Sequence, residues 1–271
     1  MTTWDFACSD PVDISIDNWT AGSIVVCGEP TSSVVVEVVP SHRHAELMDQ
    51  VQVAFEDGQL YVRGPRAGTL RRWQGLDLTI KAPEGSTCAA RTVSSDLSCV
   101  GEISAVSLHT ASGDLVAASV GDVSMRSASG DVLLNQANGM VSVHTASGSI
   151  EATRIDGDIR INTASGDVAI GYCGGPVGVH TSSGDVKLGA VRAGVELAST
   201  SGDLAVAVVP GLGVYLDLAS HSGDILSELD ESDGSDLGSE REAALRISCR
   251  TTSGDIKITK ARGVSNVPAP A

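Results

Sequence analysis

Aromatic residues are scarce in this sequence, because Phe, Trp and Tyr together make up 3% of its 271 residues. A sandwich core usually draws on large aromatic side chains, so the composition disfavours that architecture. Hydrophobic residues still reach 42%, and Val, Ile, Leu and Ala supply most of them. Small branched side chains suit thin layers of stacked strands, and the 30 glycines suit many tight turns.

Basic residues are also few, with 18 Lys and Arg against 34 Asp and Glu and a net charge of −16. Nucleic-acid binding depends on clustered Lys and Arg that neutralise phosphates, so we expect no nucleic-acid partner. The same balance disfavours unaided binding to an anionic membrane surface. It fits a basic partner, a cation, or simple solubility.

Long apolar runs are missing, since no stretch of about 18 apolar residues occurs, and we expect no membrane-spanning helix. Met1–Asp10 has neither a basic stretch nor an apolar run of signal-peptide length, which predicts a cytoplasmic location. The six cysteines form no Cys-x-x-Cys pair and no zinc spacing. We expect them to be reduced, with Cys88, Cys99 and Cys249 buried as small hydrophobic residues.

Motifs that carry catalysis are absent as well. The chain has no Gly-x-Ser-x-Gly, no His-Glu-x-x-His and no phosphate-binding loop. A polysaccharide-active enzyme would need paired carboxylates on a strand face and aromatic platforms for sugar rings, and the repeats described next offer neither. We therefore expect a protein that is not an enzyme and uses no cofactor, with a polysaccharide-active enzyme as the weakest alternative.

A repeated Ser-Gly-Asp sequence followed by Leu, Val or Ile dominates the chain from residue 112 onward. It recurs every 17 or 18 residues up to Asp203, counting the degenerate Ser147-Gly148-Ser149, and then after 21 and 31 residues. A second apolar position lies nine residues earlier in each repeat, as Val177 does before Val186. Apolar residues alternate with period two around both positions, which is typical of strands with one buried face. The sequence therefore predicts an all-β, parallel β-solenoid, right-handed by the usual crossover rule, with two short strands in each coil of about 18 residues.

Stacking the coils in sequence order predicts four inward columns of apolar side chains. This order leaves the coil from Ile247 to Ile258 exposed at the end of the solenoid, so end-to-end association stays open as an alternative. The first column holds Val106, Val123, Val141, Ile159, Val177, Val195, Leu216 and Ile247, and the third holds Leu97, Leu115, Val132, Ile150, Val168, Val186, Leu204, Ile225 and Ile256.

The chain divides into three predicted regions. Residues 1–87 are expected to form an irregular β cap, residues 88–260 the solenoid, and residues 261–271 a disordered tail. Residues 228–242 interrupt the repeats as a long acidic loop. The cap is predicted to contain one helical turn at Ala45–Gln50 and strands at Val12–Ile16, Ser23–Cys27, Ser33–Val39, Val51–Phe55, Gln59–Arg63 and Leu76–Ala82.

One segment carries a resemblance to a known family. The sequence Leu-Asp-Leu-Thr-Ile-Lys-Ala-Pro-Glu-Gly-Ser at residues 76–86, followed by serial Thr-Ala-Ser-Gly-Asp-Val units, resembles a bacterial β-strand-repeat family of unknown function, also called a "putative adhesin" family. The resemblance extends over about residues 10–260. It implies an adhesive or envelope-associated role and supplies no catalytic residues.

The aspartates of the repeats form the sharpest candidate site. They should stack on one another at equivalent turns of successive coils. A weak calcium ladder is one interpretation, although the Gly-Gly-x-Gly-x-Asp spacing of calcium-binding β-rolls is missing. The preferred interpretation is structural, with Ser or Asp oxygens bonding free turn amides, and we predict no metal site. The aspartates concerned are Asp114, Asp131, Asp167, Asp185, Asp203 and Asp224.

A second candidate site is an outward face rich in basic side chains. Its members are His109, Arg126, His144, Arg160 and His180. Successive histidines lie two coils apart, too far to share a metal, so the alternatives are a solvated polar face or a flat binding face. We predict a non-catalytic scaffold or interaction module with a protein partner or self-association. An envelope-associated adhesin or glycan-binding protein is the alternative.

Overall fold

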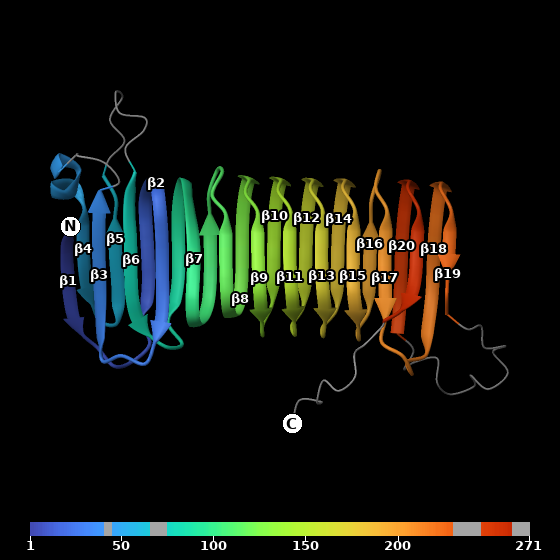
Figure 1. Cartoon of the computed structure of the whole chain (residues 1–271), viewed down its shortest axis with the longest axis horizontal. Coiled ribbons are helices and arrows are strands. Elements are labelled where there is room, and N and C mark those ends of the chain that lie inside the picture. The colour runs from blue at the N-terminus through green and yellow to red at the C-terminus, as the bar shows by residue number, and fades with distance from the viewer. Residues whose placement is uncertain (41–44, 66–74, 230–244, 262–271) are drawn as a thin grey trace.

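The computed structural model describes residues 1–40, 45–65, 75–229 and 245–261. Its described part contains 21 strands, connected in one sheet, and one short 3₁₀ helix, η1 (Ala45–Gln50). The strands lie side by side along one long axis, as Figure 1 shows. The predicted all-β parallel solenoid is confirmed, and the hand of its coil stays a prediction.

The central coils each consist of two strands that pair in parallel with the coils before and after. β12, for example, pairs with β10 on one side and with β14 on the other. In β7 and β8 the chain stays extended around a turn, so each of these long strands contributes to both faces. The strands are β7 (Thr87–His109), β8 (Leu115–Ser129), β9 (Val132–Ala137), β10 (Val141–Ser147), β11 (Ile150–Ile155), β12 (Ile159–Ser165), β13 (Val168–Cys173), β14 (Val177–Ser183), β15 (Val186–Val191), β16 (Val195–Ala198) and β17 (Leu204–Val208).

The core lies between the two faces of the coil, where the predicted columns meet. Val168 is 1% exposed and lies in register between Ile150 and Val186 of the neighbouring coils. Every member of the first column from Val106 to Val195 and of the third column from Leu97 to Leu204 is buried. Burial of each Val, Leu or Ile contributes about 1.5–3 kcal/mol. Because a single coil has no face of its own to cover these side chains, stability comes from stacking.

The C-terminal coils stack in a different order from the sequence. β20 (Leu245–Ser253) pairs with β16 on one side and with β18 (Val214–Ser222) on the other. Likewise β21 (Ile256–Lys260) lies between β17 and β19 (Ile225–Ser227). The last coil in the sequence is thus inserted before the preceding one, and β18 and β19 form the end of the solenoid (Figure 1).

This order corrects the predicted end of the solenoid. Ile247 and Ile258 are 0% exposed, because both lie between two coils. Leu216 is half-buried and Ile225 is 46% exposed, because nothing in the described chain covers them on their outer side. The prediction that the coil Ile247–Ile258 is the exposed one was therefore wrong.

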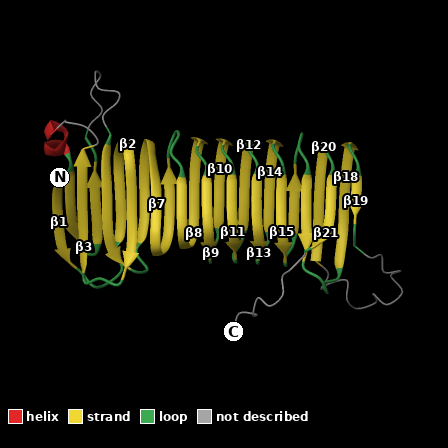
Figure 2. Ribbon diagram, in the orientation of Figure 1, coloured by secondary structure: helices red, strands yellow, loops and turns green. Residues whose placement is uncertain are grey.

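At the N-terminal end, too, the order of the strands in the stack differs from their order in the sequence. β2 (Asp13–Glu29) pairs in parallel with β7 on one side and with β5 (Gln59–Arg63) and β6 (Leu76–Pro83) on the other. Antiparallel strands then close this end, as β3 (Ser33–Pro40) pairs with β6, β1 (Thr2–Ala7) with β3, and β4 (Gln52–Glu56) with β5. The rings of Phe6 and Phe55 meet here at 5.3 Å. Figure 1 labels these strands at the N-terminal end, and Figure 2 shows η1 in red beside them.

Two predicted segments fall almost wholly outside the described residues. Only Glu228 and Leu229 of the acidic segment 228–242 are described, and only Ala261 of the tail 261–271. The six strands predicted for residues 1–87 correspond to parts of β2 to β6, and η1 occupies the predicted helical turn. β1 was not predicted, although its Trp4 and Phe6 alternate with the polar Asp5 and pack partly buried against the core.

Candidate functional site: an aspartate ladder and a polar outer face

The repeat aspartates form a ladder of hydrogen bonds between coils. The backbone N–H of Asp131 donates to Asp114 Oδ1 at 2.8 Å, and the N–H of Asp203 donates to Asp185 Oδ1 at 2.9 Å. Each of these two carboxylates thus accepts from the turn amide of the next coil in the stack. The same contact joins Asp96 to Asp114, Asp131 to Ser149, Asp167 to Asp185, Asp203 to Asp255 and Asp255 to Asp224.

The glycine of the Ser-Gly-Asp turns is needed for close stacking. A Cβ on Gly166 would lie 2.1 Å from the carbonyl oxygen of Gly148 in the coil before, and its φ is +151°. The turns therefore pack backbone on backbone, and the aspartate can reach the next amide. This geometry supports the structural interpretation of the Ser-Gly-Asp repeat. Among the residues that the structure describes, no group of three His, Cys, Asp or Glu side chains could hold a metal ion.

The histidine column lies on one outer face in continuous register. His109 pairs with Arg126 of the next coil, and Arg126 with His144. Asn162 follows His144, and His180 follows Asn162. His109, Arg126, His144 and His180 are exposed. The structure thus brings four of the five predicted face residues into one straight column.

Arg160 lies on the same face but in the neighbouring column. It pairs with Ser142 on one side and Gly178 on the other. Its guanidinium is 3.8 Å from the Asp158 carboxylate, and its Nη1 contacts Met140 Sδ at 3.5 Å. Arg160 is therefore partly neutralised, whereas Arg126 has no ion pair among the described residues.

A shallow hollow marks the beginning of this column. It has a volume of about 450 Å³, and three basic side chains and three hydroxyl-bearing side chains surround it. Arg91 also contacts Asp17 at 3.3 Å. Such a mixture of guanidinium, imidazole and hydroxyl groups suits the oxygens of an anionic group. The lining residues are Arg91, Thr92, His109, Thr110, Arg126 and Ser127.

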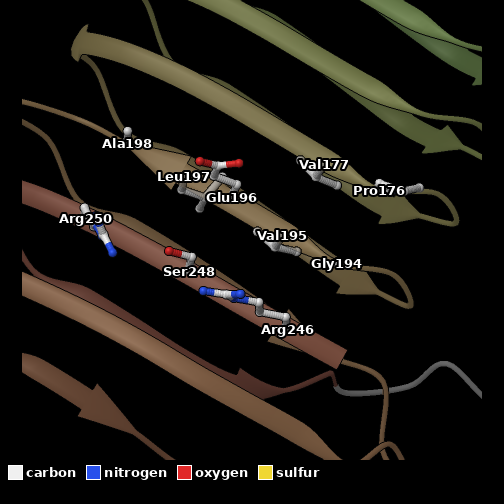
Figure 3. A pocket seen from close by; sticks show the side chains of 10 residues that line it. All are labelled: Pro176, Val177, Gly194, Val195, Glu196, Leu197, Ala198, Arg246, Ser248 and Arg250. Carbon is white, nitrogen blue, oxygen red and sulfur yellow. The ribbon is translucent and has the colours of Figure 1, made fainter. Parts of the chain in front are cut away.

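A second hollow, of about 530 Å³, lies on the same face where β16 is short and β20 is inserted beside it. Figure 3 shows Glu196 on β16 and, on the neighbouring strand, Arg246, Ser248 and Arg250. The carboxylate of Asp217 on β18 binds Arg250 at 3.1 Å and Arg246 at 3.9 Å. The sequence analysis missed this cluster, because it did not place β20 between β16 and β18.

The opposite face is less polar. A hollow of about 400 Å³ there is lined by residues that include Leu133, Ala169, Gly171 and Lys187. Beside it the Arg154 guanidinium stacks 4.2 Å from the centre of the Tyr172 ring and binds Asp156 at 2.6 Å. The hydrogen bond to Asp156 raises the pKa of Arg154, against the opposing effect of burial. The Arg154 guanidinium is thus paired within the chain, with the Tyr172 ring and with the Asp156 carboxylate.

Four of the six cysteines belong to the core. All six are free, and Cys88, Cys99, Cys173 and Cys249 are buried. Burial raises the pKa of the Cys99, Cys173 and Cys249 thiols to about 12. The thiolate that would attack an electrophile or bind a metal is therefore disfavoured at these positions.

These features place the chain among parallel β-solenoid repeat proteins. Comparison with known families then identifies it: the chain belongs to the Toastrack DUF4097 family, whose model matches residues 17–259. The resemblance carried by residues 76–86 and the Ser-Gly-Asp units is confirmed. A search of curated proteins found no match. No helix in the described parts of the chain is long and apolar enough to cross a membrane.

Several solved structures are similar to this chain at low identity. A "putative adhesin" from Bacteroides fragilis shares 14% identity with a TM-score of 0.45, covering 95% of this chain and 96% of its own. One from Parabacteroides merdae shares 11% identity with a TM-score of 0.43, covering 96% of each chain. A "putative lipid binding protein" from Parabacteroides distasonis shares 17% identity with a TM-score of 0.44, again covering 96% of each. Likenesses of this size carry no inference about function.

Proposed function

We propose that this protein is a non-catalytic binding module that presents its flat outer face to a protein partner. The observation that carries the proposal is the straight column of exposed basic side chains from His109 to His180. Stacked coils hold these groups at fixed spacing, so little conformational freedom is lost when a partner binds.

The partner in this proposal presents carboxylates to the face. Asp217 supports this choice, since its carboxylate lies between Arg246 and Arg250 on the same face. Arg126 and His109, which line the hollow at the other end of the column, could receive a partner's carboxylate in the same way. The large negative charge of the chain elsewhere would repel acidic partners, so binding would be confined to this face.

We also propose that the protein works in the cytoplasm. The six free cysteines support this location, because free thiols, here two half-buried and four buried, persist in a reducing compartment. Cell fractionation tests it directly. Recovery of the protein with the cell envelope would favour the adhesin or glycan-binding alternative and would make glycan arrays the next measurement.

Affinity capture from native lysate tests the binding face. The full chain is compared with a His109→Ala/Arg126→Ala/His144→Ala variant. A Glu151→Ala/Lys187→Ala/Arg192→Ala variant, altered at exposed positions away from this column, is the matched control. We expect a stoichiometric protein partner with the wild type and the control, and its loss with the first variant. Equal recovery by both variants, or no partner at all, would contradict the proposal.

A further inference from the structure

The strand at the C-terminal end of the solenoid has one unpaired edge. β18 is nine residues long and pairs with β20 on one side, and no other strand of the described chain pairs with it. Its sequence, Val-Tyr-Leu-Asp-Leu-Ala-Ser-His-Ser, contains no Lys, Pro or Gly. Edge strands are usually kept from pairing by such residues, by shortness or by a covering segment. β18 lacks the first two protections.

The two ends of the solenoid differ in this respect. At the N-terminal end, short antiparallel strands and the Phe6–Phe55 contact close the core. At the C-terminal end the described coil that follows β19 does not cover it, because β20 and β21 are inserted on its inner side. The C-terminal end is therefore the open one within the described chain.

The backbone hydrogen bonds that join each coil to the next stop at the last described coil. The N–H of Leu204 donates to Asp255 O, and the N–H of Ile256 donates to Asp224 O. Ile225 occupies the next position, and no described coil lies beyond it. The Asp224 carboxylate likewise accepts from no described amide, whereas Asp203 and Asp255 do so at 2.8 Å.

Apolar side chains accompany these free backbone groups. Leu216 and Leu218 of β18 are half-buried, while Ile247 and Cys249 beside them are 0% exposed. Ile225 of β19 is 46% exposed. The inner columns thus continue to the end of the solenoid and finish uncovered. A covering element must supply both a strand edge and inward apolar residues.

We propose that the element is a second copy of this chain, joined end to end by antiparallel pairing of β18 with β18. The contact would add a strand to the free edge of β18, antiparallel where the coils within the chain pair in parallel. In a two-fold pair centred on Asp217, Leu216 of one copy lies opposite Leu218 of the other. The inward leucines are then mutually covered, so this surface is complementary to itself.

Charge also permits this arrangement. The two Asp217 carboxylates would face each other, but each already contacts Arg246 and Arg250 of its own chain. The two Asp224 turns would lie at opposite ends of the paired strands, so their carboxylates would not repel each other. The N-terminal end plays no part, and the assembly stops at two copies.

Sedimentation velocity of the full chain over a range of concentrations tests the proposal. We expect the wild type to shift toward twice the mass of one 27.7 kDa chain as concentration rises. Ile225→Lys places a charge on β19, in the uncovered apolar end that the second copy would close, and should reduce association at least tenfold. Leu226→Lys is the matched control, since Leu226 is 51% exposed but points away from the core, in register with Lys257.

The outcomes separate this proposal from its competitors. A wild type that remains a single chain at all concentrations would overturn it and would indicate that another segment of the chain covers β18. Open-ended assemblies would also overturn it, because they require the N-terminal end. Equal association of the two lysine variants would place the contact elsewhere. The proposed binding face is independent, since the triple variant at His109, Arg126 and His144 should dimerise normally.

Discussion

The carboxylate of Asp203 accepts a 2.8 Å hydrogen bond from the backbone N–H of Asp255, although 52 residues separate the two in the chain. Asp255 makes the same contact with the N–H of Asp224, which precedes it by 31 residues. The ladder therefore passes through the last coil of the sequence before it reaches the end of the solenoid. Its continuity shows that β20 and β21 fit the stack as well as a coil in sequential position does.

The ladder should contribute to stability at each step. Asp185→Ala removes the acceptor of the Asp203 N–H, and we expect a loss of about 0.5–1.5 kcal/mol in the free energy of unfolding. Asp185→Asn keeps an acceptor oxygen and should lose less. Urea denaturation measures both. Asp158→Ala, which removes only a 3.8 Å contact with Arg160, is the control and should change little.

The effect of calcium on the melting temperature separates the structural role of the ladder from the calcium alternative. We expect added Ca²⁺ to leave the melting temperature of the wild type unchanged, because the carboxylates already bond backbone amides. A calcium-dependent rise that Asp185→Ala abolishes would support the calcium alternative and contradict the structural role.

Glycine in the Ser-Gly-Asp turn should be irreplaceable by alanine. In Gly166→Ala the new Cβ would meet the Gly148 carbonyl at 2.1 Å in a left-handed conformation. We expect a loss of more than about 2 kcal/mol, or roughly 4 °C in melting temperature by circular dichroism. Gly178→Ala is the matched control, since its Cβ would have no neighbour nearer than 3.9 Å. A comparable loss in the control would refute the packing argument.

The order of the C-terminal coils can be tested with two isoleucines of one column. Ile256 is 0% exposed and Ile225 is 46% exposed. Ile256→Ala should cost about 2–5 kcal/mol, while Ile225→Ala should cost less than about 1.5 kcal/mol. Urea denaturation at low protein concentration keeps association out of the comparison. If the coils stacked in sequence order, the larger loss would come from Ile225→Ala.

The buried thiols should make stability fall at alkaline pH. Burial raises the pKa of Cys173 from 9.0 to about 12, so between these values the unfolded chain loses a proton that the folded chain keeps. The contribution of this thiol to the free energy of unfolding is fully present below pH 9. Above pH 9 it falls by about 1.4 kcal/mol per pH unit. Cys173→Ala should therefore show a shallower decline between pH 8 and about 10.5.

A truncation at a neighbouring buried residue without a thiol separates the effect of thiol titration from the effect of lost packing. Val191→Ala lies in the same column, in register with Cys173, and carries no thiol. It should lose stability at every pH and keep the wild-type slope. The explanation fails if Cys173→Ala and Val191→Ala decline equally with pH.

Much of the fold could be predicted from short-range pattern. The nine-residue half-step and the alternation around Val168 and Val186 identified the strands and their inward columns, because period two places alternate side chains on one face. The same pattern put His109, Arg126, His144 and His180 outward, and their register in the structure agrees. Local periodicity therefore predicted which side chains share a column.

Long-range order could not be predicted in the same way. The coils present similar apolar columns and, except in the coil with Ser149, a similar aspartate, so Leu216 and Ile247 are equally acceptable neighbours for Val195. The cluster of Glu196, Arg246 and Arg250 depends on that order and was missed. At the N-terminal end, the position of β2 between β7 and the pair of β5 and β6 is a choice of the same kind.

The sequence by itself determined the length of the coil, the strands within it, and the direction in which each side chain points. Only the tertiary structure decided the order of the coils at both ends, and hence which edge remains open. The physical reason is that alternation and turn chemistry act between residues close in sequence. Stacking acts between coils that are nearly interchangeable, so its outcome depends on the packing of the whole chain.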